Sequence, residues 1–403
     1  MKIVFINQYF PPDSAPTGLM LEKVAGRLMA DGHEVTVLCA KGGYASSGKE
    51  EDGAGRSEVE DEGVRVIRLG STAFGRNTFA GKLADYTFFY VGVAWQLAFV
   101  RPKPDRFVAL TTPPFLSILA RLISKIRGGD HAHWVMDLYP DVMVAHGMLK
   151  KNTVTTNVLK SLARWGYGGK RCKIVLTLGP DMQERTAAYL SESTPRQWVP
   201  LWGTSNSSSE RNHFSVGEGP KTEGQIVLMY SGNMGLGHRF GEFLEAASVA
   251  GEGFVWKFHG RGKRRPEIER FCQDNPGAPV TVGDYVPQDQ LAEHLAGADV
   301  HLASLDPAWD GTMVPSKLQG IFSMGRPVIF VGSDTCSIGH WILESDGGWV
   351  VPPGEMSSLL AALNEAANPA VRVRKGQNAL AFSKRRFCGE TNASKISELL
   401  SYP

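Results

Sequence analysis

The sequence predicts an α/β protein built from two doubly wound domains, each with a parallel sheet covered by helices on both faces. The chain has 403 residues, which exceeds the size at which a single hydrophobic core stops growing. Short apolar runs typical of buried strands alternate with helical patterns along the whole chain. This alternation restarts after residue 220, so we expect two such domains in series.

The predicted strands of the first domain are short and rich in apolar residues. They are KIVFINQ (2–8), EVTVLCA (34–40), FVAL (107–110), AHWVM (132–136) and KIVLTL (173–178), and the helical pattern LMLEKVAGRLMADG (19–32) separates the first two. Those of the second domain are IVLMY (226–230), FVWKFHG (254–260), PVTVG (279–283), VHLASL (300–305), PVIFV (327–331) and GGWVVP (347–352). Residues 204–224 are rich in serine, glycine and charge and have no apolar period, which predicts a linker. We therefore place the domains at 1–203 and 225–385, followed by a last helix at 386–403.

Composition and charge argue against nucleic-acid binding, secretion and a membrane-spanning segment. The formal net charge is +2, which does not favour a nucleic-acid binder, and no aromatic residues interleave with the basic clusters. The five cysteines are scattered with no C-x-x-C pair, which favours a reducing, cytoplasmic compartment, and we expect no secretory signal at the start. The most apolar segment, residues 88–100, has 13 residues and is too short to span a bilayer. It predicts a core helix, with contact to a membrane surface as the alternative.

A glycine-rich turn follows the first strand of the second domain. In YSGNMGLGH (230–238), Gly232, Gly235 and Gly237 lie between a predicted strand and a predicted helix. Ligands of open α/β sheets bind at the carboxyl ends of strands, where such a turn presents backbone N–H groups to an anion. The order differs from the G-x-G-x-x-G of dinucleotide folds, and no Walker motif occurs. The turn is either a phosphate site or a tight strand-to-helix connection without a ligand.

Two further basic sites belong to the same domain. In VPSKLQGIFSMGRPVIF (314–330), Ser316 and Lys317 lie at a predicted helix start, where a cation opposes the helix dipole unless an anion shares the site. In FHGRGKRRPEIERF (258–271), Arg261 lies between two glycines and Lys263 follows. A planar guanidinium suits a phosphate, although solvated basic side chains are also common at such positions. Together with the glycine turn, these sites favour a phosphate-bearing ligand.

These blocks carry a family resemblance. The stretches YSGNMGLGHRFGEFLEAA, VTVGDYVPQDQLAEHLAGADVHLASL, VPSKLQGIFSMGRPVIF and GGWVVPPGE resemble, in order, segments of the GT-B glycosyltransferases of family 4. The N-terminal NQYFPPDSAPTGLMLEKVAGRLMADGHEVTVL is similar to the start of a bacterial fucosaminyl- and fucosyltransferase-like branch that builds surface polysaccharides. The resemblance implies two Rossmann-like domains facing across a cleft, with the sugar nucleotide on the second. It also implies transfer with retention, no metal and no cofactor, and a final helix that returns to the first domain.

The resemblance implies a set of donor-side residues in the second domain. Lys317 is expected to be catalytic by neutralising the leaving phosphates. The donor-binding residues are expected to be Gly232, Asn233, Gly235, His238, Arg239, Arg261, Lys263, Ser316 and Gln319. The family's glutamate pair, E-x7-E, is replaced here by Thr312 and Gly320, and Asn233 stands where an arginine is frequent. Either Gln319 has taken over the ribose contact, or nucleotide recognition has changed, or the chain is an inactive member.

The first domain is expected to hold the acceptor side. In HAHWVMDLYPD (131–141), the D-L-W-P-like motif implies Asp137 at the reaction centre, with Asp141 as second choice. Either carboxylate could instead cap the next helix. In PPDSAPTG (11–18), Thr17 and Gly18 are expected to face the acceptor, and a helix capped by Ser14 or Thr17 is the alternative.

His131 and His133 have a spacing that could ligate a metal, but we expect both at the start of the strand, far from its carboxyl end. The segment 150–173 is a different kind of candidate, because its basic residues are interspersed with Leu159, Leu162 and Trp165. It predicts either peripheral contact with an anionic lipid surface or a solvated helix face.

The predicted function is a retaining glycosyltransferase of surface polysaccharide assembly. Its partners would be a nucleoside-diphosphate sugar donor and a glycan or polyprenyl-linked acceptor, and its place the cytoplasm or the inner face of the cytoplasmic membrane. Two alternatives remain from the same residues: a sugar-nucleotide 2-epimerase of the same fold, and a non-catalytic binding homologue, which the loss of the glutamate pair favours.

Overall fold

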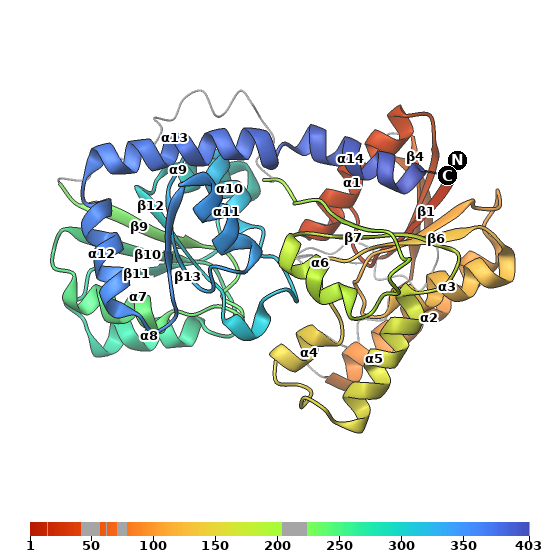
Figure 1. Cartoon of the computed structure of the whole chain (residues 1–403), viewed down its shortest axis with the longest axis horizontal. Coiled ribbons are helices and arrows are strands. Elements are labelled where there is room, and N and C mark those ends of the chain that lie inside the picture. Colours follow the sequence, from red (N-terminus) through yellow and green to blue (C-terminus); the bar gives the residue numbers. More distant parts are fainter. Residues whose placement is uncertain (14, 42–56, 62, 71–78, 204–223, 403) are drawn as a thin grey trace. The chain divides into compact units, whose positions relative to one another are not determined.

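The computed structural model describes residues 1–13, 15–41, 57–61, 63–70, 79–203 and 224–402. Ser14 and all but the last residue of the predicted linker lie outside these ranges. The chain divides into two compact units (Figure 1): unit 1 comprises Met1–Val199 with Glu390–Pro403, and unit 2 comprises Pro200–Gly389. Unit 2 thus begins at Pro200, before the predicted linker, whereas the second domain was expected to begin at residue 225.

Unit 1 contains a sheet of eight strands in the order β3-β4-β2-β1-β5-β6-β7-β8. All neighbours are parallel except β3 and β4. The strands are β1 (Lys2–Ile6), β2 (Glu34–Ala40), β3 (Ser57–Asp61), β4 (Val64–Leu69), β5 (Arg106–Ala109), β6 (Asp130–Trp134), β7 (Cys172–Thr177) and β8 (Arg196–Trp198). Of these, β3, β4 and β8 were not among the predicted strands.

Helices follow the strands of unit 1 and complete its core. They are α1 (Pro16–Ala30), α2 (Phe79–Phe99), α3 (Leu116–Arg127), α4 (Asp141–Ala145), α5 (Val154–Tyr167), α6 (Pro180–Ala187) and α14 (Gly389–Ser401). Side chains of α2 and α3 pack with alternate residues of β1, β2, β4 and β5 in one buried cluster. This alternation is what a parallel sheet with covered faces requires.

The last helix, α14, belongs to unit 1 and is held there by polar contacts. Lys23 of α1 forms an ion pair with Glu390 at 2.6 Å, and Ser397 donates a hydrogen bond to Asp31 at 2.6 Å. The buried guanidinium of Arg106 donates to the backbone carbonyl of Leu400. Two chain segments almost 300 residues apart are thereby joined in one unit.

Unit 2 contains a parallel sheet of six strands in the order β11-β10-β9-β12-β13-β14. They are β9 (Ile226–Ser231), β10 (Phe254–His259), β11 (Val280–Gly283), β12 (Val300–Ser304), β13 (Val328–Val331) and β14 (Gly348–Val351). The helices are α7 (Gly241–Val249), α8 (Arg265–Asp274), α9 (Leu291–Ala296), α10 (Lys317–Ser323), α11 (Ser337–Ser345), α12 (Met356–Ala366) and α13 (Pro369–Arg386), with the 3-10 turns η2 (Gln288–Gln290) and η3 (Pro307–Trp309). All six predicted strands of this domain are present, and the predicted fold class of two Rossmann-like domains is confirmed.

The apolar segment 88–100 departs from the expectation of a buried core helix. It is the second half of α2, and Phe89, Val93 and Leu97 do pack into the core of unit 1. On the opposite face, however, Trp95 is 70% exposed and Phe99 is 62% exposed. Within the described ranges, no helix is both long enough and apolar enough to cross a bilayer.

Candidate functional site

Lys317 lies at the carboxyl ends of the strands of unit 2, as the first residue of α10. Its ammonium group donates hydrogen bonds to the Tyr230 hydroxyl at 2.6 Å, to the Asn233 carbonyl at 3.1 Å and to Nε2 of His238 at 2.9 Å. The same nitrogen lies 4.5 Å from the centre of the Tyr230 ring. The lysine stem passes so close to Gly232 that a Cβ atom there would lie 2.7 Å from Lys317 Cε. Gly232 therefore leaves space for the lysine.

The three acceptors around Lys317 are all neutral. Nδ1 of His238 faces the Ser304 carbonyl at 2.6 Å and must donate to it, so Nε2 carries the lone pair that receives the ammonium. Burial, together with the nearby Lys317, lowers the pKa of His238 to about 3. Tyr230 is buried, and its hydroxyl donates to the Asn233 carbonyl at 2.7 Å. Among the residues that the structure describes, no negative charge therefore compensates the ammonium.

Lys317 is a half-buried cation without a nearby negative charge among the described side chains. Within the described residues it forms no ion pair, and burial lowers its pKa to about 7. A half-buried ammonium without a counter-ion is costly, whereas an anion beside it would restore the charge balance. Strongly shifted titratable groups at strand ends are candidates for functional sites. The geometry therefore fits an anion-binding position at Lys317.

The predicted glycine turn interlocks with the loop that follows β10. Gly232 donates its N–H to the His259 carbonyl at 2.9 Å, and Met234 donates to the Arg261 carbonyl at 2.8 Å. A Cβ atom at Gly260 would lie 1.9 Å from the Gly232 carbonyl oxygen, so glycine is required at this crossing. The N–H groups of Gly232 and Met234 are therefore used within the protein and are not available to a ligand. In the described part of the chain, the N–H groups of this turn left for an anion are those of Asn233, Gly235, Leu236 and Gly237.

The two predicted donor-side arginines are neutralised by carboxylates. Arg239 pairs with Glu242 at 2.5 Å and with Asp306 at 3.2 Å, which together raise its pKa. Arg261, which is exposed, pairs with Asp284 at 3.0 Å. Both guanidinium groups are thus engaged within the protein, and a donor would have to displace a carboxylate from either. Lys263 is exposed and forms no ion pair with the described residues.

The remaining donor-side residues lie along α10. Ser316 caps its start without a side-chain hydrogen bond to the helix, so its hydroxyl is not used there. Gln319 is only 1% exposed, and its amide oxygen has no hydrogen-bond partner in the described chain. Contact between Gln319 and a ribose would require this side chain to be uncovered. Thr312 is buried and donates to the Trp309 carbonyl at 2.7 Å, so it serves the loop before the helix.

Gly320→Glu is expected to leave the chain folded. A Cβ atom at this position would make only an ordinary contact, 3.5 Å from Leu295 Cδ1. Glutamate also favours a helix over glycine by up to about 1 kcal/mol. Thermal unfolding followed by circular dichroism should show an unchanged or higher Tm. Gly339→Glu is the contrasting variant, because its Cβ would lie 2.2 Å from the Ser333 carbonyl, and its Tm should fall. Unfolding of Gly320→Glu would show that this part of α10 differs from the family's pocket.

Asp137 lies just beyond β6 in unit 1. The hydroxyl of Thr111, which follows β5, accepts hydrogen bonds from the N–H groups of Met136 at 3.2 Å and Asp137 at 3.1 Å, which fixes the backbone here. The carboxylate is half-buried and meets no cation among the described residues. Burial raises its pKa to about 6. A carboxyl group that titrates near neutral pH suits proton transfer.

Asp141, the second choice on the acceptor side, is occupied within the protein. It begins α4, is 8% exposed, and pairs with Arg185 of α6 at 3.0 Å. Its other oxygen accepts a hydrogen bond from the Tyr189 hydroxyl. Its carboxylate therefore joins α4 to the α6 region rather than facing a substrate.

The loop before α1 does not have the helix cap that was offered as one of its interpretations. The helix begins at Pro16 with Ala15 as its N-cap and has no side-chain cap, so capping by Thr17 is wrong, and Ser14 lies outside the described residues. A Cβ atom at Gly18 would lie 3.2 Å from the backbone of Tyr9 and Phe10. Glycine here allows close packing of helix and loop. The Thr17 hydroxyl is buried without a partner among the described residues.

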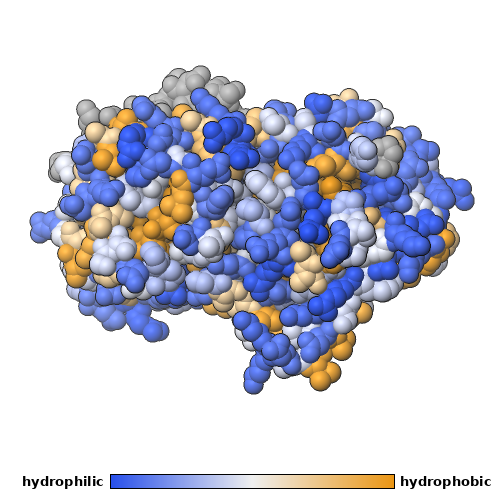
Figure 2. Space-filling model, in the orientation of Figure 1, coloured by the Kyte–Doolittle hydropathy of each residue, from blue (hydrophilic) through white to orange (hydrophobic). Residues whose placement is uncertain are grey.

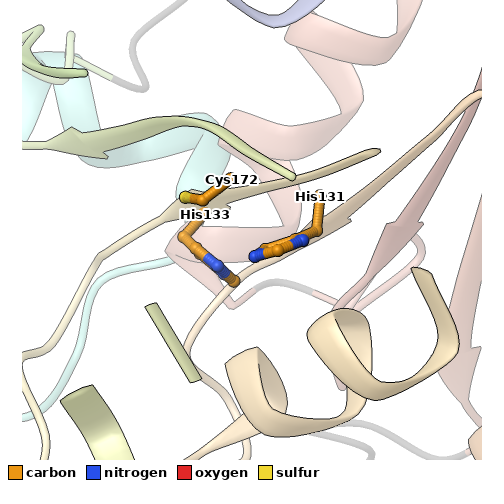
Figure 3. Close-up of side chains that lie close together, drawn as sticks. All are labelled: His131, His133 and Cys172. Atoms are coloured by element: carbon orange, nitrogen blue, oxygen red, sulfur yellow. The ribbon is translucent and has the colours of Figure 1, made fainter. Parts of the chain in front are cut away.

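His131 and His133, the second and fourth residues of β6, lie close to Cys172 at the start of β7 (Figure 3), and their ligand atoms are within 4.8 Å of one another. The expectation that both histidines lie at the start of the strand is therefore wrong for His133, which is next to the last residue of β6. Both nitrogens of His131 already have partners, the Ser124 hydroxyl at 3.1 Å and the Gly168 carbonyl at 3.2 Å. Burial lowers the pKa of His131 to about 4 and raises that of Cys172 to about 12. The nearby Arg121 further disfavours positive charge on His131. The group fits a neutral packing cluster better than a cation site.

Tyr230 is the residue at this site that the sequence analysis did not single out. It is the first residue of the YSGNMGLGH segment and the last but one residue of β9. A buried tyrosine at the end of a strand needs a partner for its hydroxyl, and that requirement was the available signal. Its partners come from the next loop and from α10, 87 residues later.

Comparison with known proteins supports the resemblance seen in the sequence. No family model matches the chain. The chain is 23% identical over 372 residues to the probable glycosyltransferase WbjE of Pseudomonas aeruginosa, covering 90% of this chain and 89% of that protein. It is 22% identical over 385 residues to the putative colanic acid biosynthesis glycosyl transferase WcaI of Escherichia coli K12, covering 91% and 92%.

The fold is also that of a solved structure. Anabaena HepE in complex with UDP and glucose superposes with a TM-score of 0.67 at 15% identity, and the match covers 100% of both chains. Sequence relatives and fold agree along nearly the whole length of the chain. The chain therefore has the GT-B fold and is similar in sequence to two curated glycosyltransferases over 90% and 91% of its length.

Proposed function

We propose that this protein transfers a glycosyl group, with retention at the anomeric carbon, from a nucleoside-diphosphate sugar to a hydroxyl of a glycan or lipid-linked acceptor. The observation that carries the proposal is Lys317, a half-buried ammonium with neutral hydrogen-bond partners and no carboxylate beside it. HepE, solved with UDP and glucose, supports the class of donor, and the name of WcaI supports a role in surface polysaccharide assembly. We place the enzyme in the cytoplasm or on the inner face of the cytoplasmic membrane.

On the donor side, the bond between the anomeric carbon and the β-phosphate oxygen breaks, and its electron pair stays on the departing diphosphate. The charge that develops there is stabilised by donors fixed before the reaction. Lys317 supplies an ammonium, while Asn233 and Gly235 supply N–H groups from the turn before α7. Ser316 and Lys263 remain available as further donors, whereas Arg239 and Arg261 first have to leave their carboxylates.

On the acceptor side, the acceptor oxygen forms the new bond to the anomeric carbon and loses its proton. Asp137 is the proposed group that orients this hydroxyl and receives the proton, because its pKa of about 6 is suited to exchange near neutral pH. Burial that raises this pKa also keeps the carboxylate from being screened by water. No metal ion is needed in this scheme.

A thermal-shift experiment tests the donor class. UDP, GDP or ADP should raise the Tm, because a ligand that binds only the folded state stabilises it by about 2.7 kcal/mol at a hundred times its Kd. The matching nucleoside without phosphates should shift the Tm far less. Absence of a shift with every diphosphate would contradict the proposed site.

Turnover then separates the transferase from its alternatives. With an acceptor supplied, a transferase releases a nucleoside diphosphate, and the release stops when the acceptor is withheld. A 2-epimerase would convert its sugar nucleotide with no acceptor at all. A non-catalytic homologue, which the loss of the glutamate pair at Thr312 and Gly320 favours, would bind the nucleotide and release nothing.

A further inference from the structure

An apolar stripe runs along the solvent face of α2. Phe88, Val91, Trp95 and Phe99 are exposed by 43%, 64%, 70% and 62%, and their spacing of three and four residues places them on one side of the helix. The rings of Trp95 and Phe99 lie 4.8 Å apart, centre to centre. The opposite side of α2 packs into the core, so the stripe is additional to what the fold of unit 1 requires.

The apolar surface continues onto two neighbouring helices. The helix α3 contacts both α2 and α5, and Arg127 at its end donates to the Leu97 carbonyl at 2.7 Å and the Val100 carbonyl at 3.0 Å. The exposed apolar residues on these helices are Leu122 and Ile126 of α3 and Val154, Val158 and Leu162 of α5. Figure 2 shows apolar side chains among hydrophilic ones at the lower tip of the right-hand unit, where α5 ends. We call these three helices the α2-α3-α5 surface.

The charged side chains that α3 and α5 contribute to this surface are all basic. Helices α3 and α5 contain no acidic residue, and their five basic residues are Arg121, Lys125, Arg127, Lys160 and Arg164. None of the five forms an ion pair with the described residues. Beyond the end of α2, Arg101 and Lys103 are exposed, and Arg101 lines a hollow of about 350 Å³ together with Trp95 and Phe99. Exposed aromatic rings thus lie beside unneutralised positive charge.

We propose that the α2-α3-α5 surface docks onto an anionic lipid membrane, with Trp95 and Phe99 entering the boundary between headgroups and acyl chains. Aromatic residues favour this boundary, and basic residues around them gain from anionic headgroups. A second copy of the chain is disfavoured as the occupant, because a symmetric contact would place the same basic helices against each other. The inference names the surface that would bring the enzyme to a lipid-linked acceptor, and it rests on the proposed function only in that respect.

Co-sedimentation with vesicles tests the inference without donor or acceptor. The intact chain should bind vesicles of phosphatidylcholine with phosphatidylglycerol more tightly than vesicles of phosphatidylcholine alone, and added salt should weaken the binding. Trp95→Ser with Phe99→Ser should weaken the binding at least about tenfold, because two large apolar groups no longer leave water. Arg101→Gln with Lys103→Gln should lose mainly the preference for anionic vesicles.

The matched control is Leu343→Ser, which removes an apolar side chain that is 58% exposed in unit 2 and should bind vesicles like the unchanged chain. All variants should keep the Tm of the unchanged chain, since each alters an exposed side chain. Vesicle binding that survives Trp95→Ser with Phe99→Ser would overturn the proposal. A second result would also overturn it: the unchanged chain does not bind vesicles, and light scattering shows that it is a dimer that Trp95→Ser with Phe99→Ser dissociates. If the membrane proposal fails, the rise in Tm on adding a nucleoside diphosphate should remain. Failure of the proposed function would instead abolish that rise, so the two failures can be distinguished.

Discussion

Lys317→Ala is expected to lower turnover by about a hundredfold or more while the chain remains folded. The ammonium has three hydrogen bonds to neutral acceptors and no counter-ion, so the negative charge of the departing diphosphate would be its natural partner. Release of nucleoside diphosphate in the presence of acceptor gives the rate, and circular dichroism gives the fold. Lys384→Ala, which removes an exposed lysine of unit 2, is the control and should keep the full rate. Unchanged kinetics in Lys317→Ala would remove the residue from the site.

The same lysine predicts a stability difference with a definite sign. Burial lowers its pKa from 10.5 to about 7, so the folded chain binds fewer protons than the unfolded chain between those values. Lys317→Met, which keeps much of the side-chain volume without the charge, should therefore raise the Tm of the ligand-free protein most clearly below pH 7. Its advantage should shrink as the pH rises from 7, because the unchanged protein gains stability there. A lower Tm for Lys317→Met at pH 6 would contradict the picture of an uncompensated ammonium.

The fold was largely predictable because buried parallel strands have a simple signature. A strand covered on both faces is a short run of apolar residues, and all eleven such runs identified in the sequence lie on strands. Strand β3 was missed because its residues SEVED are almost all polar and exposed, as suits an edge strand that must not pair with another chain. Strand β8 has three residues, which is too short for a pattern.

The α2 helix shows where a composition argument fails. Its second half is apolar on nearly every side, and an all-round apolar segment of that length normally predicts burial. Only the structure shows that Phe89 and Trp95, six residues apart, face opposite environments. Which face of a helix is buried depends on the elements that pack against it. For α2 these elements include β4 and α3, which lie elsewhere in the sequence.

The site was predictable in position but not in its charge balance. The strand ends, the glycine turn and the first residue of α10 follow from local sequence, and Lys317 lies where the helix-start pattern placed it. The carboxylates of Asp306 and Asp284 do not follow from local sequence, because they lie 67 and 23 residues from the arginines that they pair with. Only Glu242, three residues from Arg239, is a local partner. Sequence alone could therefore not separate the lysine without a counter-ion from arginines that already have one.

Asp137→Asn is expected to lower turnover by about a hundredfold to ten-thousandfold, the range typical of a lost general base, while nucleotide binding persists. The amide has nearly the shape of the carboxylate but cannot receive the acceptor proton. Nucleotide binding should persist because the phosphate-binding residues proposed here all belong to unit 2, and Asp137 belongs to unit 1. Single-turnover release of diphosphate and the UDP thermal shift measure the two properties separately. Weakened nucleotide binding with normal turnover would contradict this role.

Asp141→Asn is the matched comparison, since it makes the same chemical change four residues away. Asp141 pairs with Arg185 and accepts from Tyr189, so its loss should cost about 1–3 kcal/mol of stability with little change in the rate of the folded enzyme. Burial raises the pKa of Asp137 from 3.8 to about 6, so the stability of the folded chain falls as the pH rises between those values. At pH 7, Asp137→Asn should therefore have a Tm equal to or higher than that of the unchanged protein, while its turnover is strongly reduced. A lowered Tm in both variants would mean that Asp137, like Asp141, serves the fold rather than the reaction.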